Sequence, residues 1–133
     1  MQKNTLSKQF RLFSKSAIDK LFKEGTSLYF QPLKVIYLVE DNAAPGLECL
    51  ISIPKKRFKR AVDRNMLRRK IREAYRLHLN KLHSVAITHN ISITLAFIFT
   101  ESKPCDYIKI EEKVIHSLNK LEQIIEKSKT IVS

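Results

Sequence analysis

Lysine and arginine side chains are concentrated in one short part of the sequence, residues 55–76, which read KKRFKRAVDRNMLRRKIREAYR. This segment holds eleven basic residues and only two acidic ones, Asp63 and Glu73, and so carries a net charge of +9. The whole chain of 133 residues carries +12, which leaves +3 for the other 111 residues. Charge that serves only solubility is dispersed over a surface, whereas clustered charge of one sign is the electrostatic footprint of a phosphate-binding site. The segment therefore indicates the binding of a polyanion.

The spacing within this segment predicts a helix from Ala61 to about Leu82. At about 100° per residue, the apolar side chains fall on one arc and the basic side chains on the arc beside it. The apolar arc should pack on a core and holds Leu67, Ile71, Ala74, Tyr75, His78 and Leu82. The basic arc should face solvent or a ligand and holds Arg64, Asn65, Arg68, Arg69, Arg72 and Arg76. A solvated face is the plainer interpretation, but few acidic neighbours are present to neutralise these arginines.

The sequence gives little support for a metal site, a nuclease active site, a membrane span or a secretory signal. Cys49 and Cys105 are the only cysteines, they lie far apart, and no Cys/His spacing suits zinc. The acidic residues form no visible cluster with histidine that would suit a two-metal nuclease. The longest apolar runs are far too short to span a bilayer, and the first residues lack the pattern of a secretory signal. We therefore expect a cytoplasmic protein with no membrane partner and no metal site of its own.

Hydrophobic periodicity, together with the residues that cap or break helices and strands, predicts a small domain of mixed helices and strands. A first helix, residues 16–23, has Ser14 as its N-cap and Gly25 as its stop. Residues 91–100 alternate as a strand with one apolar face, and a last helix follows Asp106. The other expected strands are residues 28–31, 33–40 and 47–53. We predict an α/β (α+β) two-layer sandwich in which the basic helix is the crossover of a β-α-β unit. A single domain should cover residues 14–128, between a basic and aromatic arm (1–13) and a short tail (129–133).

Residues 51–76 resemble the signature of the bacterial ribonuclease P protein subunit. The matching residues are Lys55-Lys56, Ala61-Val62, Arg64-Asn65, Arg68-Arg69 and Arg72-Glu73. Two N-terminal segments are also similar to the family, Phe10-Arg11-Leu12 and Phe22-Lys23-Glu24-Gly25-Thr26-Ser27. The resemblance runs in the same order over roughly residues 10–125. Met66 departs from it, because the family has arginine there, and an apolar side chain cannot make that residue's phosphate contact.

This resemblance implies both a fold and a function. The fold would be a four-stranded mixed sheet with three helices and a left-handed β-α-β crossover, although the general rule favours the right-handed form. The function would be that of a subunit of ribonuclease P, which removes the 5′ leader from precursor tRNA. The RNA subunit would carry the active site with its Mg²⁺ ions, and the protein alone would bind no cofactor. The protein would be a monomer apart from the RNA.

The resemblance also assigns residues of this chain to two surfaces. The surface for the catalytic RNA comprises Lys55, Lys56, Arg57, Lys59, Arg60, Arg64, Asn65, Arg68, Arg69, Arg72 and Arg76. A cleft between the sheet and the first helix would hold the single-stranded leader by stacking and apolar contacts. Its expected residues are Phe10, Phe13, Ile18, Phe22, Tyr37 and Ser52. The family's aromatic position in the first helix aligns with Ile18, and plain core packing remains an alternative for Phe22 and Tyr37.

Two further functions remain as alternatives. A ribosomal-type or other structural RNA-binding protein would account for the clustered charge but not for the two paired motifs. A protein nuclease with its own active site is poorly supported, because the sequence offers no suitable acidic cluster.

Overall fold

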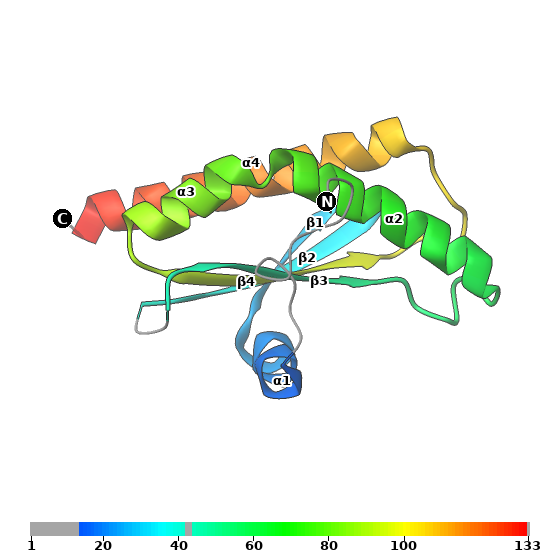
Figure 1. Cartoon of the computed structure of the whole chain (residues 1–133), viewed down its shortest axis with the longest axis horizontal. Coiled ribbons are helices and arrows are strands. Elements are labelled where there is room, and N and C mark those ends of the chain that lie inside the picture. The colour runs from blue at the N-terminus through cyan, green and yellow to red at the C-terminus, as the bar shows by residue number, and fades with distance from the viewer. Residues whose placement is uncertain (1–13, 42–43, 133) are drawn as a thin grey trace, which may run out of the picture.

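The computed structural model describes residues 14–41 and 44–132. Three helices cover one face of a central sheet, and the first helix lies alone against the other face (Figure 1). The elements follow in the order α1 (Lys15–Glu24), β1 (Thr26–Phe30), β2 (Leu33–Glu40), β3 (Gly46–Ser52), α2 (Ala61–His78), α3 (Asn80–Thr88), β4 (Ser92–Phe99) and α4 (Tyr107–Val132). No helix within the described ranges is long and apolar enough to cross a bilayer.

The sheet has four strands in the order β1-β2-β4-β3. β1 pairs with β2 and β2 with β4 in antiparallel fashion, whereas β3 and β4 run parallel. Parallel neighbours need a crossover connection, and α2 followed by α3 supplies it. The expected β-α-β unit and the mixed four-stranded sheet are therefore confirmed.

The alternation expected for the last strand is also confirmed. Ile93, Leu95, Phe97 and Phe99 of β4 are fully buried in the main core, which lies between the sheet and α2–α4. Ala96 points to the other face and packs with Leu21 of α1. β4 is thus covered on both faces, and its residues read as a nearly continuous apolar run.

The expected helix from Ala61 to about Leu82 is two helices rather than one. α2 ends at His78, and α3 begins at Asn80 after Leu79, which keeps an αR conformation with φ −79° and ψ −18°. No proline or glycine marks this break, so the periodicity continues through it. The described residues therefore form four helices instead of the expected three, and Leu79 at the break is buried in the same core as Leu82.

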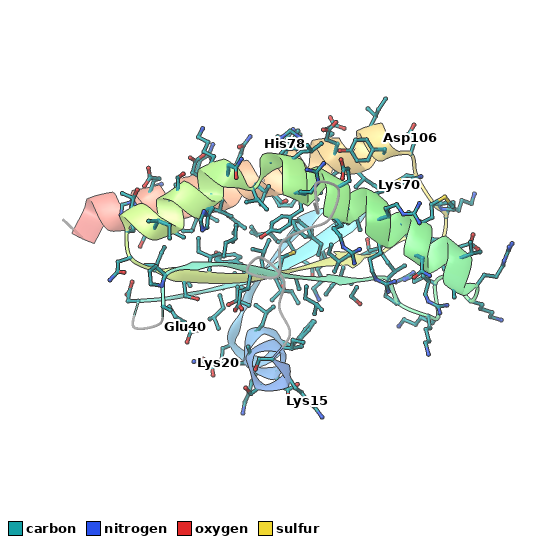
Figure 2. The ribbon with its side chains drawn as sticks, viewed as in Figure 1. Lys15, Lys20, Glu40, Lys70, His78 and Asp106 are labelled. Atoms are coloured by element: carbon teal, nitrogen blue, oxygen red, sulfur yellow. The ribbon has the colours of Figure 1, made fainter. Side chains whose placement is uncertain are left out.

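α1 adds a layer that the two-layer description did not include. Ser14 accepts a hydrogen bond from the backbone N–H of Ala17, which confirms the expected N-cap. Leu21 is fully buried against the sheet, and Lys20 Nζ lies 2.5 Å from Glu40 Oε2 (Figure 2). Gly25 ends the helix where a Cβ would lie 2.7 Å from Ile36 Cγ2 and 3.0 Å from the Tyr37 carbonyl oxygen, both in β2. A glycine at this position therefore lets α1 pack closely on β2.

Candidate nucleic-acid interface

The loop between β3 and α2, residues 54–60 and hereafter the basic loop, holds five exposed cationic side chains. These are Lys55, Lys56, Arg57, Lys59 and Arg60. Phe58, between them, is buried, and its ring centroid lies 5.7 Å from that of Phe99 in β4. The backbone N–H groups of Arg57 and Phe58 donate to the Pro54 carbonyl at 3.1 and 3.4 Å. One buried aromatic and a tight turn therefore hold a loop whose charges all face solvent.

The expected basic residues of α2 lie in unequal environments. Arg69 and Asn65 are exposed, and Arg68 is partly exposed. Arg68 Nη1 donates to Asn65 Oδ1 at 2.8 Å, so the amide orients this guanidinium on the outer face of the helix. Arg64 is partly buried, and its Nη1 donates to the carbonyl oxygens of Phe58 and Lys59 at 2.8 and 2.9 Å. Arg64 thus points back toward the basic loop.

Arg76 is paired within its own helix. Its Nη2 and Nε donate to the two carboxylate oxygens of Glu73 at 2.6 and 3.1 Å, a two-pronged contact that holds both side chains. The hydrogen bond from Arg76 lowers the pKa of Glu73, and the same bond raises the pKa of Arg76. The charge at this end of the basic face is therefore largely neutralised.

Arg72 of α2 is partly exposed, and its charge acts on a residue of β3. Burial raises the pKa of the Cys49 thiol in β3 well above its ordinary value, and the positive charge of Arg72 partly opposes that effect. Cys49 is buried among core residues and is a free thiol. The charge of Arg72 therefore acts on a buried thiol of the sheet.

Lys70 lies outside the basic arc and joins α2 to the segment before α4. Its Nζ donates to the Cys105 carbonyl at 3.1 Å, near Asp106, whose Oδ1 accepts from the Lys109 backbone N–H and caps α4 (Figure 2). The expected start of the last helix at Asp106 is confirmed. Lys70 is used within the fold, which leaves the loop and the outer face of α2 as the exposed basic surface.

The sheet face that carries α1 has one cross-strand row whose residues all remain at least partly exposed. The register pairs Tyr29 with Lys34, Lys34 with Ile98, and Ile98 with Ser52. Tyr29 is exposed and the other three are partly exposed, and Lys34 Nζ lies 5.7 Å from the centroid of the Tyr29 ring. We call these four residues the open row. It runs directly into the basic loop, because Ser52 ends β3 two residues before Pro54.

The structure places the residues expected to line the leader cleft in different surroundings. Ser52 belongs to the open row, whereas Ile18 packs against the cluster that contains Leu21 and Ala96. Phe22 of α1 is 47% exposed. Phe10 and Phe13 lie outside the described residues.

Tyr37, which the sequence analysis placed in the same cleft, lies on the other face of the sheet from α1. It packs against the main core on the opposite face and lines a hollow of about 310 Å³ with Val39, Ile125 and Ser128. The neighbouring Ile36 points toward α1 instead. β2 is apolar on both faces, so its sequence shows no alternation that would reveal which residues face which side.

Sequence reasoning also missed three residues on this face. Tyr29 and Lys34 in the open row were not singled out, and neither was Ile98. Ser52 and Ile98 are opposite one another because β3 and β4 are paired in parallel. Strand pairing is long-range information, however, and no local pattern supplies it. Among the residues that the structure describes, no group of three or more His, Cys, Asp or Glu side chains is placed to hold a metal ion.

A small α+β domain with a basic crossover helix and an exposed basic loop is built as a nucleic-acid-binding protein. Comparison with known families narrows this class. The family described as Ribonuclease P matches residues 6–122, and the chain belongs to that family. This confirms the resemblance and the role of a ribonuclease P protein subunit.

Individual relatives agree with this assignment. The ribonuclease P protein component of Porphyromonas gingivalis is 38% identical over 114 residues, which cover 85% of this chain and 83% of the relative. The corresponding protein of Borreliella burgdorferi is 30% identical over 130 residues, which cover 97% of this chain and the whole relative.

Solved structures support the fold. The Staphylococcus aureus RNase P protein superposes with a TM-score of 0.65 at 23% identity, covering 86% of this chain and 96% of that one. The RNase P protein from Thermotoga maritima superposes with a TM-score of 0.60 at 24% identity, covering 83% and 96%. The α+β fold class predicted from the sequence is therefore confirmed.

Proposed function

We propose that this protein binds the catalytic RNA of ribonuclease P through the basic loop and the outer face of α2, and that the complex removes the 5′ leader from precursor tRNA. One observation carries the proposal. The five cations of the basic loop are exposed, and within the described residues their one ion-pair contact joins Arg60 to Asp63 at 4.0 Å. Cations without acidic partners can neutralise phosphates and release counterions. Arg68 and Arg69 extend the same surface along α2.

The open row is our candidate contact for the leader. Single-stranded RNA is held by flat aromatic and apolar surfaces next to cations. Tyr29 offers a ring, Ile98 an apolar surface, and Lys34 a charge for the backbone. A leader lying on this row would reach the basic loop beyond Ser52, so both RNAs would meet at one end of β3.

In this proposal, hydrolysis takes place on the RNA subunit rather than on protein side chains. Mg²⁺ bound by the RNA supplies the activation of water and the stabilisation of the leaving oxygen. The protein contributes binding and orientation. The two acidic residues of segment 55–76 contact arginines, Asp63 contacting Arg60 and Glu73 contacting Arg76. We further propose that a single copy of the chain acts with the RNA in the cytoplasm.

Reconstitution tests this function. The purified protein alone should leave precursor tRNA intact, and at low Mg²⁺ it should restore 5′ cleavage by the cognate ribonuclease P RNA. Cleavage by the protein alone would contradict the proposal, and so would an RNA whose activity the protein does not change. If the protein binds the RNA but cleavage does not rise, the alternative of a structural RNA-binding protein is supported instead.

A further inference from the structure

Arg64 differs from the other arginines of α2 because its guanidinium contacts the protein's own backbone. It lies three and seven residues before Leu67 and Ile71, which are fully buried. This spacing places Arg64 on the inner side of the helix. Its Nη1 donates to the carbonyls of Phe58 and Lys59 at 2.8 and 2.9 Å. Both acceptors belong to the basic loop.

The basic loop has few other constraints. Arg60, the N-cap residue of α2, makes no side-chain capping hydrogen bond. Within the described residues, its other contacts are the buried Phe58 ring, the turn at Pro54 and the Arg60–Asp63 pair at 4.0 Å. Five like charges within six residues repel one another and favour a spread of loop conformations. A charged donor that holds two adjacent carbonyls opposes that spread, because hydrogen bonds to charged groups are stronger than neutral ones.

We propose that Arg64 is a positioning residue that fixes the shape of the basic loop, so that the loop cations meet the RNA already arranged. The binding consequence rests on the proposed function, whereas the effect on the loop is a property of the free protein. If Arg64 is removed, binding must order the loop and affinity falls. The number of phosphates neutralised stays the same, because the loop cations are still present.

Hydrogen exchange on the free protein tests whether Arg64 fixes the shape of the basic loop. The amides of Arg57 and Phe58 are hydrogen-bonded to Pro54 and report on the loop. We expect Arg64→Ala to speed their exchange by at least about tenfold, the factor that corresponds to the loss of a single charge-assisted hydrogen bond. Arg69→Ala is the matched control, because it removes the same charge from an exposed position on the same helix. Equal exchange in wild type and Arg64→Ala, or an equal increase in both variants, would overturn the proposal.

The salt dependence of binding to the cognate ribonuclease P RNA tests whether Arg64 raises affinity without contacting a phosphate itself. Arg64→Ala should weaken binding about tenfold with little change in the salt slope, whereas Arg69→Ala should reduce that slope by about 0.9. Arg64→Lys keeps a cationic donor and should recover most of the lost affinity. A reduced slope in Arg64→Ala with unchanged loop exchange would show a direct phosphate contact and overturn the proposal. If wild type fails to bind this RNA, the proposed function is wrong, and the exchange result still decides the role of Arg64.

Discussion

Ile36 and Tyr37 are consecutive residues of β2 whose side chains lie on opposite faces of the sheet. Ile36 is 5% exposed and packs with Leu21 beneath α1. Tyr37 packs against the main core, on the side of α4. The surface beside α1 is therefore supplied by Lys34 rather than by Tyr37, because alternate residues of a strand share a face.

Replacing Lys34 with alanine should weaken binding of a precursor tRNA that carries a leader. We expect a loss of about three- to tenfold, since one cation near the RNA backbone is removed. Tyr37→Phe is the control and should bind as wild type does. The measurement compares leader-bearing and leaderless RNA with the reconstituted ribonucleoprotein. An equal loss on both RNAs, or a loss in Tyr37→Phe, would place the leader elsewhere.

Introducing arginine at Met66 should strengthen binding to the catalytic RNA. Met66 is 42% exposed on α2, close in sequence to Arg68 and Arg69. One added phosphate contact should raise the salt slope by about 0.9 and the affinity several-fold. Ile87→Arg adds the same charge to α3 at a position that is 50% exposed and should have a smaller effect. Equal gains in the two variants would mean that only net charge matters.

Changing Glu73 to glutamine should release Arg76 toward the RNA. The carboxylate that neutralises this guanidinium is lost, so we expect affinity to rise about threefold and the salt slope to increase. Glu112→Gln removes an equal charge from an exposed position on α4 and serves as the control. If both variants gain equally, the Glu73–Arg76 pair has no specific effect on binding.

The same pair should contribute to the pH dependence of stability. Arg76 lowers the pKa of Glu73 in the folded protein below its ordinary value of 4.5. The pair therefore stabilises the fold above the unfolded pKa, and this contribution is lost as the pH falls through the folded pKa. Wild type should lose more stability than Glu73→Gln as the pH falls below about 4.5, by a small amount because both groups are partly exposed. Parallel curves in acid denaturation would contradict this.

Removing the hydroxyl of Tyr75 should stabilise the protein. Tyr75 is fully buried, and its ring packs edge-on against Phe97 with 5.7 Å between the ring centroids. Its hydroxyl has no hydrogen-bond partner within the described residues. Tyr75→Phe should therefore raise the free energy of unfolding by about 1 kcal/mol. Tyr107→Phe is the control, because its hydroxyl contacts Glu111 at 3.4 Å. A destabilised Tyr75→Phe in chemical denaturation would show that the hydroxyl has a partner.

The sequence predicted much of the fold because local patterns carry that information. Alternation in β4, the caps at Ser14 and Asp106, and the apolar arc of α2 all follow from which residues one element must bury. The break at Leu79 was not predicted, because no proline, glycine or change of periodicity accompanies it. The placement of α1 on the sheet face opposite to α2–α4 was also not predicted, since a short amphipathic helix fits either face of a sheet.

The sequence by itself determined that this chain is a basic α+β protein with a polyanion-binding segment. Charge and periodicity are properties of consecutive residues, and tertiary structure does not alter them. Only the tertiary structure decided how the arginines differ: Arg64 holds the basic loop, Arg76 is neutralised by Glu73, and Arg69 is left exposed. It also decided that Lys34 and Ser52 share a row across three strands. Such relationships depend on side-chain reach and on strand pairing between distant segments, so they are fixed only when the chain is folded.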